Sequence, residues 1–172
     1  QWMAYVYLPN KLFNDNEWLG NSLNGMHRHP MAGYLRYENM FIQNWFVEKH
    51  GWDAVGRLWN DCDYGEDPFQ TYMRTRMEGT NAEKINQLAD EMWEWGARMT
   101  TYDFESIREL GKNSINRRKQ TALTKQSAGF WSPTKADCIE NYGNNAIQLN
   151  VPAAGDTVYA EFEGLAGKEG YT

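Results

Sequence analysis

The sequence predicts a mainly α fold of about five helices with a C-terminal β-hairpin or the start of a β-sandwich, α+β overall. Apolar residues recur at helical spacing through the middle of the chain, and helix-capping residues precede these stretches. After about Lys119 this periodicity gives way to short segments broken by Gly, Pro and Asn. We therefore divide the chain into a helical subdomain, residues 1–118, and an irregular and β segment, residues 119–172.

Large aromatic side chains dominate the apolar composition. The chain has 172 residues, near the size of one domain, and includes 8 Trp and 10 Tyr. Such rings contribute strongly to a core, but the Tyr hydroxyl and the Trp indole N–H also need polar partners. The composition indicates a globular protein with a semi-polar core or a surface that binds carbohydrate.

The charge argues against a nucleic-acid partner. The formal net charge is −6 and the sequence pI is about 5.1, whereas phosphate binding requires a basic field. The one basic run, residues 117–119, is typical of a solvated face. No apolar stretch approaches the length of a membrane span, and no signal peptide opens the chain, so we expect this segment to be soluble as given.

The two cysteines, Cys62 and Cys138, are too far apart in the sequence to form a CxxC zinc or redox motif. Metal ligation by cysteine is therefore not expected. Two interpretations stay open: one long-range disulfide in an oxidising compartment, or two free, buried thiols.

The first predicted helix extends from Tyr34 to His50 and ends at Gly51, where a left-handed cap is expected. Trp52 would fold back onto Val47 as the hydrophobic contact of that cap. The helix carries an apolar stripe made of Leu35, Met40, Phe41, Trp45, Phe46 and Val47. The stripe predicts that these rings, Trp45 among them, face the core.

Capping residues mark the next two helices. Asp53 is predicted to cap a short helix directly after it. Asp67, Pro68 and Gln70 then stand in the order of an N-cap, an N1 proline and a capping-box partner. This order predicts a helix that ends at Arg76.

Two further helices are predicted in the same way. Thr80 and Glu83 repeat the capping box, and apolar residues follow at helical spacing as far as Met99. Asp103 is expected to cap a short helix that closes at Gly111.

Residues 146–151 and 157–162 alternate apolar and polar side chains and are predicted to be two strands joined by a short loop. A lone hairpin is marginally stable in water. We therefore expect Val158 and Phe162 to pack on the helices, or the hairpin to pair edge to edge with another molecule.

The candidate metal ligands are His27 and His29. Two imidazoles at positions i and i+2 share a face only in an extended strand, and Pro30 favours an extended conformation for His29. A metal site would need a third ligand. The alternative is a loop whose histidines form local hydrogen bonds or face solvent.

Several stretches carry a family resemblance. They are WMAYVYLP, YLRYENMFIQNWFVEKHGWDAVGRLW, ARMTTYDF and YGNNAIQLNVPAAGDTVYAEFEGLAG. Together they resemble a group of bacterial, mostly secreted proteins of uncharacterised function that are similar to Glu-zincin (gluzincin-like) metallopeptidases. The resemblance covers most of the chain and implies a secreted or cell-surface location.

In Glu-zincins a His-Glu-x-x-His helix supplies two zinc ligands and the general base. This sequence contains no such motif. WMAYVYLP is similar to the part that follows the glutamate ligand, so the resemblance places the zinc-binding half before Gln1. No cofactor is expected in this segment, although zinc is implied for a longer protein. Tyr37 is the candidate residue for stabilising an oxyanion; its alternative is a tyrosine packed within the helix.

Two functions follow from these observations. The leading hypothesis is the helical segment of a secreted metallopeptidase-like protein, inactive alone because the zinc-binding helix is absent. The alternative is a non-catalytic binding module that uses exposed Trp and Tyr to recognise a glycan, a peptide or a protein.

Overall fold

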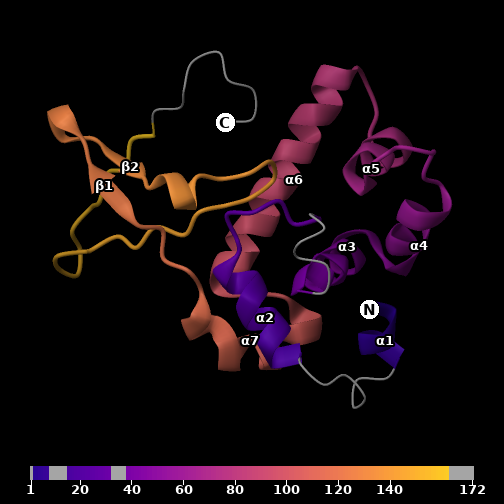
Figure 1. Ribbon diagram of the computed structural model, residues 1–172, viewed down its shortest axis with the longest axis horizontal. Helices are drawn as coiled ribbons and strands as arrows, with labels where there is room; N and C mark the ends of the chain where they lie inside the picture. The colour runs from indigo at the N-terminus through magenta and orange to yellow at the C-terminus, as the bar shows by residue number, and fades with distance from the viewer. Residues whose placement is uncertain (1, 8–14, 32–37, 163–172) are drawn as a thin grey trace.

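The computed structural model describes residues 2–7, 15–31 and 38–162. Its helices are α1 (Trp2–Tyr7), α2 (Asp15–Asn24), α3 (Ile42–His50), α4 (Trp52–Asn60), α5 (Pro68–Arg76), α6 (Asn81–Thr101) and α7 (Arg108–Ser114); its strands are β1 (Leu123–Lys125) and β2 (Trp131–Pro133). Short 3-10 segments lie at Glu38–Phe41, Glu105–Ile107, Ile115–Arg117, Ser127–Gly129 and Lys135–Asp137. The predicted mainly α fold with a small antiparallel β element is confirmed (Figure 1).

The long helix α6 runs through the middle of the molecule (Figure 1). Helices α3, α4 and α5 lie on one side of it, and the β1–β2 hairpin projects on the other. Aromatic rings fill the space between the helices: the Trp45 ring of α3 lies 6.3 Å from that of Trp95 in α6, and Phe46 lies 5.2 Å from Tyr72 in α5. The predicted placement of Trp45 in the core is confirmed, because its side chain is fully buried.

The predicted helix over residues 34–50 is observed as a 3-10 turn followed by α3; residues 34–37 lie outside the described residues. Gly51 separates α3 from α4 and has the expected positive φ of 81°, but its ψ of 169° is extended, so it is not a left-handed cap. Asp53 does not cap α4, because Gly51 holds that position. The Asp53 carboxylate lies in the first turn and accepts a hydrogen bond from Arg57.

Both predicted capping boxes are confirmed. At the start of α5, Asp67 accepts hydrogen bonds from the backbone of Phe69 and Gln70, and the Gln70 side chain accepts one from the Asp67 N–H. Thr80 and Glu83 make the equivalent pair at the start of α6. Such reciprocal bonds satisfy N–H groups that have no partner within the helix.

The predicted helix between Asp103 and Gly111 is observed with different ends. Helix α7 begins at Arg108 and continues past Gly111, and Asp103 binds the Arg108 guanidinium instead of capping the helix. Gly111 faces the ring of Tyr102, the left-handed residue that ends α6; a Cβ at Gly111 would lie 1.8 Å from that ring. Gly111 is therefore required because it packs closely against Tyr102, and not because it ends the helix.

The predicted strands over residues 146–151 and 157–162 are not observed. Val158 is 38% exposed and Phe162 is 73% exposed, so neither packs on the helices as expected. The antiparallel pair is β1 with β2, in which Leu123 faces Pro133. Alternation alone misplaced the hairpin, because a strand needs backbone partners, and within the described residues no backbone hydrogen bond pairs 157–162 with another segment.

A set of three hydrogen bonds, here called the clasp, joins the loop after α2 to residues 140–144. The N–H of Glu140 donates to the carbonyl of His27, and that of Asn144 donates to Met26, each at 2.8 Å. The N–H of His29 donates to a Glu140 carboxylate oxygen at 2.9 Å. The clasp ties the segment after residue 118 to the helical body, while the domain division itself stays a prediction.

Replacing Gly51 by Val or Ala is expected to lower the free energy of unfolding by about 1–3 kcal/mol, because its dihedral angles belong to a region that almost only glycine adopts. A Cβ at Gly51 would meet nothing within 4 Å, so the loss in Gly51→Ala comes from the backbone alone. Urea denaturation measures it. An unchanged midpoint in both variants would contradict the assigned conformation.

Candidate functional site

The residues singled out from the sequence do not form one site. Tyr37 lies outside the described residues. His27 is buried, and burial, followed by the nearby Lys119 and Arg28, lowers its pKa. The His29 ring lies against Phe69 and Tyr142, and its Nδ1 accepts a hydrogen bond from the Met31 N–H at 3.0 Å; burial lowers its pKa as well.

Neither histidine belongs to a group of three or more potential metal ligands in the described part of the chain. Among the described residues, no group of three or more His, Cys, Asp or Glu side chains is placed to hold a metal ion. His27 and His29 instead serve the loop after α2, where their backbone groups take part in the clasp. Cys62 and Cys138 are free thiols, and the expectation that they are buried is wrong, because both are exposed.

Three titratable side chains from three helices meet in a polar cluster that the sequence did not predict. Tyr72 of α5 donates a hydrogen bond to Glu91 Oε2 of α6 at 2.5 Å. His50 Nε2, at the end of α3, lies within hydrogen-bonding distance of Tyr72 Oη and 3.2 Å from Glu91 Oε2. The side chains of His50 and Glu91 are 21% and 19% exposed, whereas Tyr72 is buried.

The chemistry open to this polar cluster is the sharing of a proton between an imidazole, a carboxylate and a phenol. Burial, followed by the hydrogen bond and the charge of Glu91, raises the pKa of Tyr72. Its hydroxyl is enclosed and already bonded, so it has no direct access to a substrate. The polar cluster therefore ties α3, α5 and α6 together.

Raising the pH above about 10 is expected to destabilise the protein through Tyr72. Because its pKa in the folded state is raised above the ordinary 10.0, the folded chain keeps a proton that the unfolded chain loses. The stabilisation is complete below that pH and is lost as the pH rises, by up to about 1.4 kcal/mol per pH unit. Tyr72→Phe should remove this difference, as measured by urea unfolding between about pH 9 and about pH 11. Parallel stability curves for wild type and variant would contradict it.

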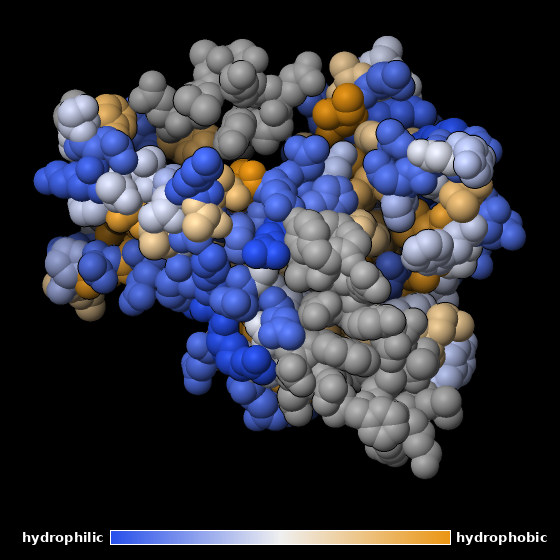
Figure 2. Space-filling model, viewed as in Figure 1, coloured by the Kyte–Doolittle hydropathy of each residue, from blue (hydrophilic) through white to orange (hydrophobic). Residues whose placement is uncertain are grey.

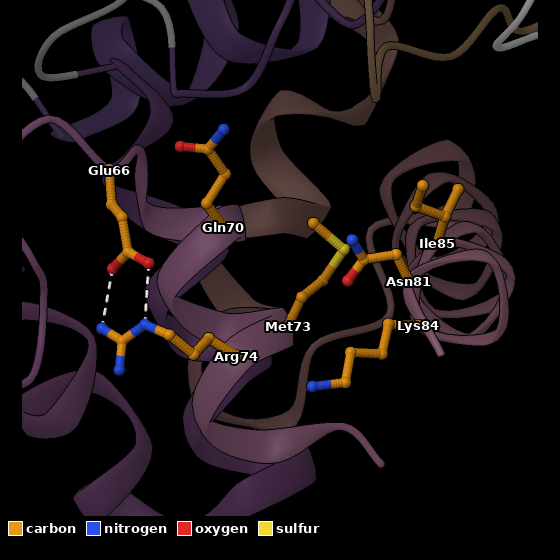
Figure 3. A pocket seen from close by; sticks show the side chains of 7 residues that line it. All are labelled: Glu66, Gln70, Met73, Arg74, Asn81, Lys84 and Ile85. Carbon is orange, nitrogen blue, oxygen red and sulfur yellow. Dashed lines mark hydrogen bonds and ion pairs between the residues drawn. The ribbon is translucent and has the colours of Figure 1, made fainter. Parts of the chain in front are cut away.

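An open cleft of about 490 Å³ lies between α5 and the start of α6 (Figure 3). Figure 3 shows Met73 of α5 pointing toward Asn81 and Ile85 of α6. Two of the charged side chains that line the cleft bind each other: Arg74 donates two hydrogen bonds of 2.7 Å to Glu66, and this pairing lowers the pKa of Glu66 to about 2. Gln70, Asn81 and Lys84 supply the other polar groups that line the cleft.

Exposed aromatic rings are the most prominent surface feature. Among the described side chains, four tryptophans have more than half of their surface exposed: Trp52 and Trp59, both of α4, Trp93 of α6 and Trp131 of β2. On the face shown in Figure 2, outside the grey atoms, hydrophobic residues are scattered among hydrophilic ones. A large exposed aromatic ring combines an apolar face with a polar edge, which suits it to contact a ligand.

Taken together, the fold and surface define a mainly helical protein with a small antiparallel sheet and exposed tryptophans. The chain belongs to a family described as a family of unknown function (DUF6055), which it matches over residues 1–172. No curated protein and no solved structure matches it. No helix in the described part of the chain is long and apolar enough to cross a membrane.

Proposed function

We propose that this chain acts as a recognition module whose exposed aromatic side chains bind a glycan, a peptide or a protein. The observation that carries the proposal is the set of four exposed indoles, which are accompanied by further exposed rings at Tyr7, Tyr64, Phe130, Tyr159 and Phe162. Tryptophan offers a wide apolar face together with an N–H donor, and it loses little conformational entropy on binding.

Ligand binding can be followed through tryptophan fluorescence, with glycans and peptides as probes and single Trp→Ala variants of the four indoles. We expect at least one variant to lose binding while keeping its melting temperature, because the rings lie outside the core. Four variants that bind every probe like the wild type would contradict a recognition role for these rings.

A second proposal rests on the sequence resemblance to metallopeptidase-like proteins. In this proposal the chain is the helical segment of a secreted enzyme, and residues outside this segment supply the ligands that bind zinc. The segment alone would be inactive. Metal analysis and a peptidase assay test this: no stoichiometric zinc and no turnover are expected, and activity with one bound metal would overturn it.

The remaining proposals concern partners and location. We expect no nucleic-acid partner, because the net charge of −6 opposes phosphate binding. Self-association through an edge strand was expected at residues 157–162, which do not form a strand; in the described part of the chain the strands available for such pairing are β1 and β2. The secreted or cell-surface location rests on the resemblance alone.

A further inference from the structure

One face of α4 carries two exposed indoles with a glycine between them. Trp52, Gly56 and Trp59 occupy positions i, i+4 and i+7, which lie on one face of a helix. The two tryptophans are 60% and 63% exposed. A Cβ at Gly56 would meet nothing within 4 Å, so the surface between the rings is an open notch.

The Trp52 ring is held in place from the core. It lies against the ring of Trp2, at 5.6 Å between centroids, and Trp2 is itself buried. The Trp2 indole N–H donates to Asn44 Oδ1 at 3.1 Å, and Asn44 in turn donates to Ser106. Trp52 therefore offers its exposed surface from a fixed support, which lowers the entropic cost of binding.

Polar side chains border the two indoles along one flank of α4. Asp53, Arg57 and Asn60 are exposed there, and the Asp53–Arg57 ion pair is 3.2 Å long. The opposite side of the helix faces the core through Ala54, Val55 and Leu58. The face therefore places carboxylate, guanidinium and amide groups beside the aromatic surface.

We propose that this face, Trp52–Gly56–Trp59, binds an extended β-1,4-linked glycan, with one sugar ring stacked on each indole and the chain crossing the notch at Gly56. The two tryptophans are separated by seven residues, about 10.5 Å along the helix axis. The two-sugar repeat of an extended β-1,4-linked chain is of this order, so the stacked rings are alternate ones and the sugar between them crosses the notch. Asp53, Arg57 and Asn60 would bond the hydroxyl groups at the edges of the sugars.

The chemistry of the face fits a glycan better than a protein partner. The cores of protein interfaces are continuous apolar surfaces depleted of charge. Here the exposed apolar surface consists of two separate rings, with an ion pair and an amide beside them. A sugar chain has apolar and polar surface that matches this arrangement, because each pyranose has an apolar face and a rim of hydroxyl groups. This inference rests on the recognition role proposed above and deepens it.

Titration of the whole chain with cellohexaose and with the hexamer of β-1,4-linked N-acetylglucosamine, by calorimetry, tests the assignment. We expect at least one of the two to bind, and Trp52→Ala and Trp59→Ala each to weaken binding by about tenfold or more. Trp93→Ala, which removes an equally exposed indole of α6, is the matched control and should leave the Kd unchanged.

Gly56→Leu provides a test that leaves both indoles in place. The added Cβ would meet no atom within 4 Å, and the rest of the side chain would fill the notch between the two rings. Binding should therefore fall while the melting temperature is maintained or raised, because leucine also favours a helix over glycine. Two outcomes would overturn the proposal: no binding of either hexasaccharide by the wild type, or binding that survives both Trp52→Ala and Trp59→Ala. In the latter case loss of binding in Trp93→Ala or Trp131→Ala would retain the recognition role but move it to another surface. A dimer dissociated by Trp59→Ala, with no glycan bound, would assign the face to a second copy of the chain.

Discussion

Replacing Trp45 by Ala is expected to lower the free energy of unfolding by about 3–5 kcal/mol. The Trp45 ring is fully buried and lies 5.0 Å from the Phe46 ring and 6.3 Å from that of Trp95. Truncation would leave a cavity at the junction of α3 and α6 that these large rings cannot refill without leaving their own contacts. Chemical denaturation followed by circular dichroism measures the loss.

Two further variants isolate the cause of the Trp45 effect. Trp45→Phe keeps most of the buried ring and also removes an indole N–H that has no hydrogen-bond partner within the described residues. Its cost should be well below that of Trp45→Ala. Trp93→Ala, at an exposed position of α6, should change stability little. Equal losses in Trp45→Ala and Trp93→Ala would show that the apolar stripe of α3 does not face the core.

The second large effect is expected from Gly143→Ala, at the clasp. An added Cβ would lie 2.3 Å from the carbonyl oxygen of His27, and this neighbour is backbone that cannot rotate away. The added methyl group must push residues 140–144 away from the loop after α2 and weaken the hydrogen bonds that Glu140 and Asn144 donate to it. We expect a loss of about 1–3 kcal/mol in thermal or urea unfolding.

Gly56→Ala is the control for Gly143→Ala. Residue 56 also lacks a side chain, but it lies in a helix where a Cβ meets nothing, so alanine should stabilise the protein slightly. The contrast in sign between the two substitutions separates a steric cause from a general effect of replacing glycine. If Gly143→Ala proved as stable as wild type, residues 140–144 would not contact His27 as described.

The sequence predicted those elements that depend on neighbouring residues. The capping boxes at Asp67 and Thr80 act within three positions, and the stripe that buries Trp45 repeats within one helix. All residues of such a pattern lie within a few positions of each other in the sequence, so the five central helices could be located. The end of α7 was misplaced because Gly111 is explained by the ring of Tyr102, a tertiary contact.

The rest depends on partners that are distant in the sequence. The polar cluster joins His50, Tyr72 and Glu91, and nothing near any one of them signals the other two. The strands were misplaced for another reason. β1 and β2 pair across a short turn, but with three residues each they are too short to show a clear alternation. Residues 157–162 alternate but have no backbone partner among the described residues. For the surface, the high tryptophan content left a semi-polar core and exposed rings both open, and only the fold showed that Trp52 and Trp59 flank an open glycine.

The clasp also bears on the order in which the chain folds. His29 and Glu140 are 111 positions apart, so their contact requires closure of a long loop, whereas α3 to α6 form contacts between successive helices. The helical body can therefore assemble early and the clasp can close last. We expect the loop after α2 to be accessible to proteases in a refolding molecule until the clasp closes.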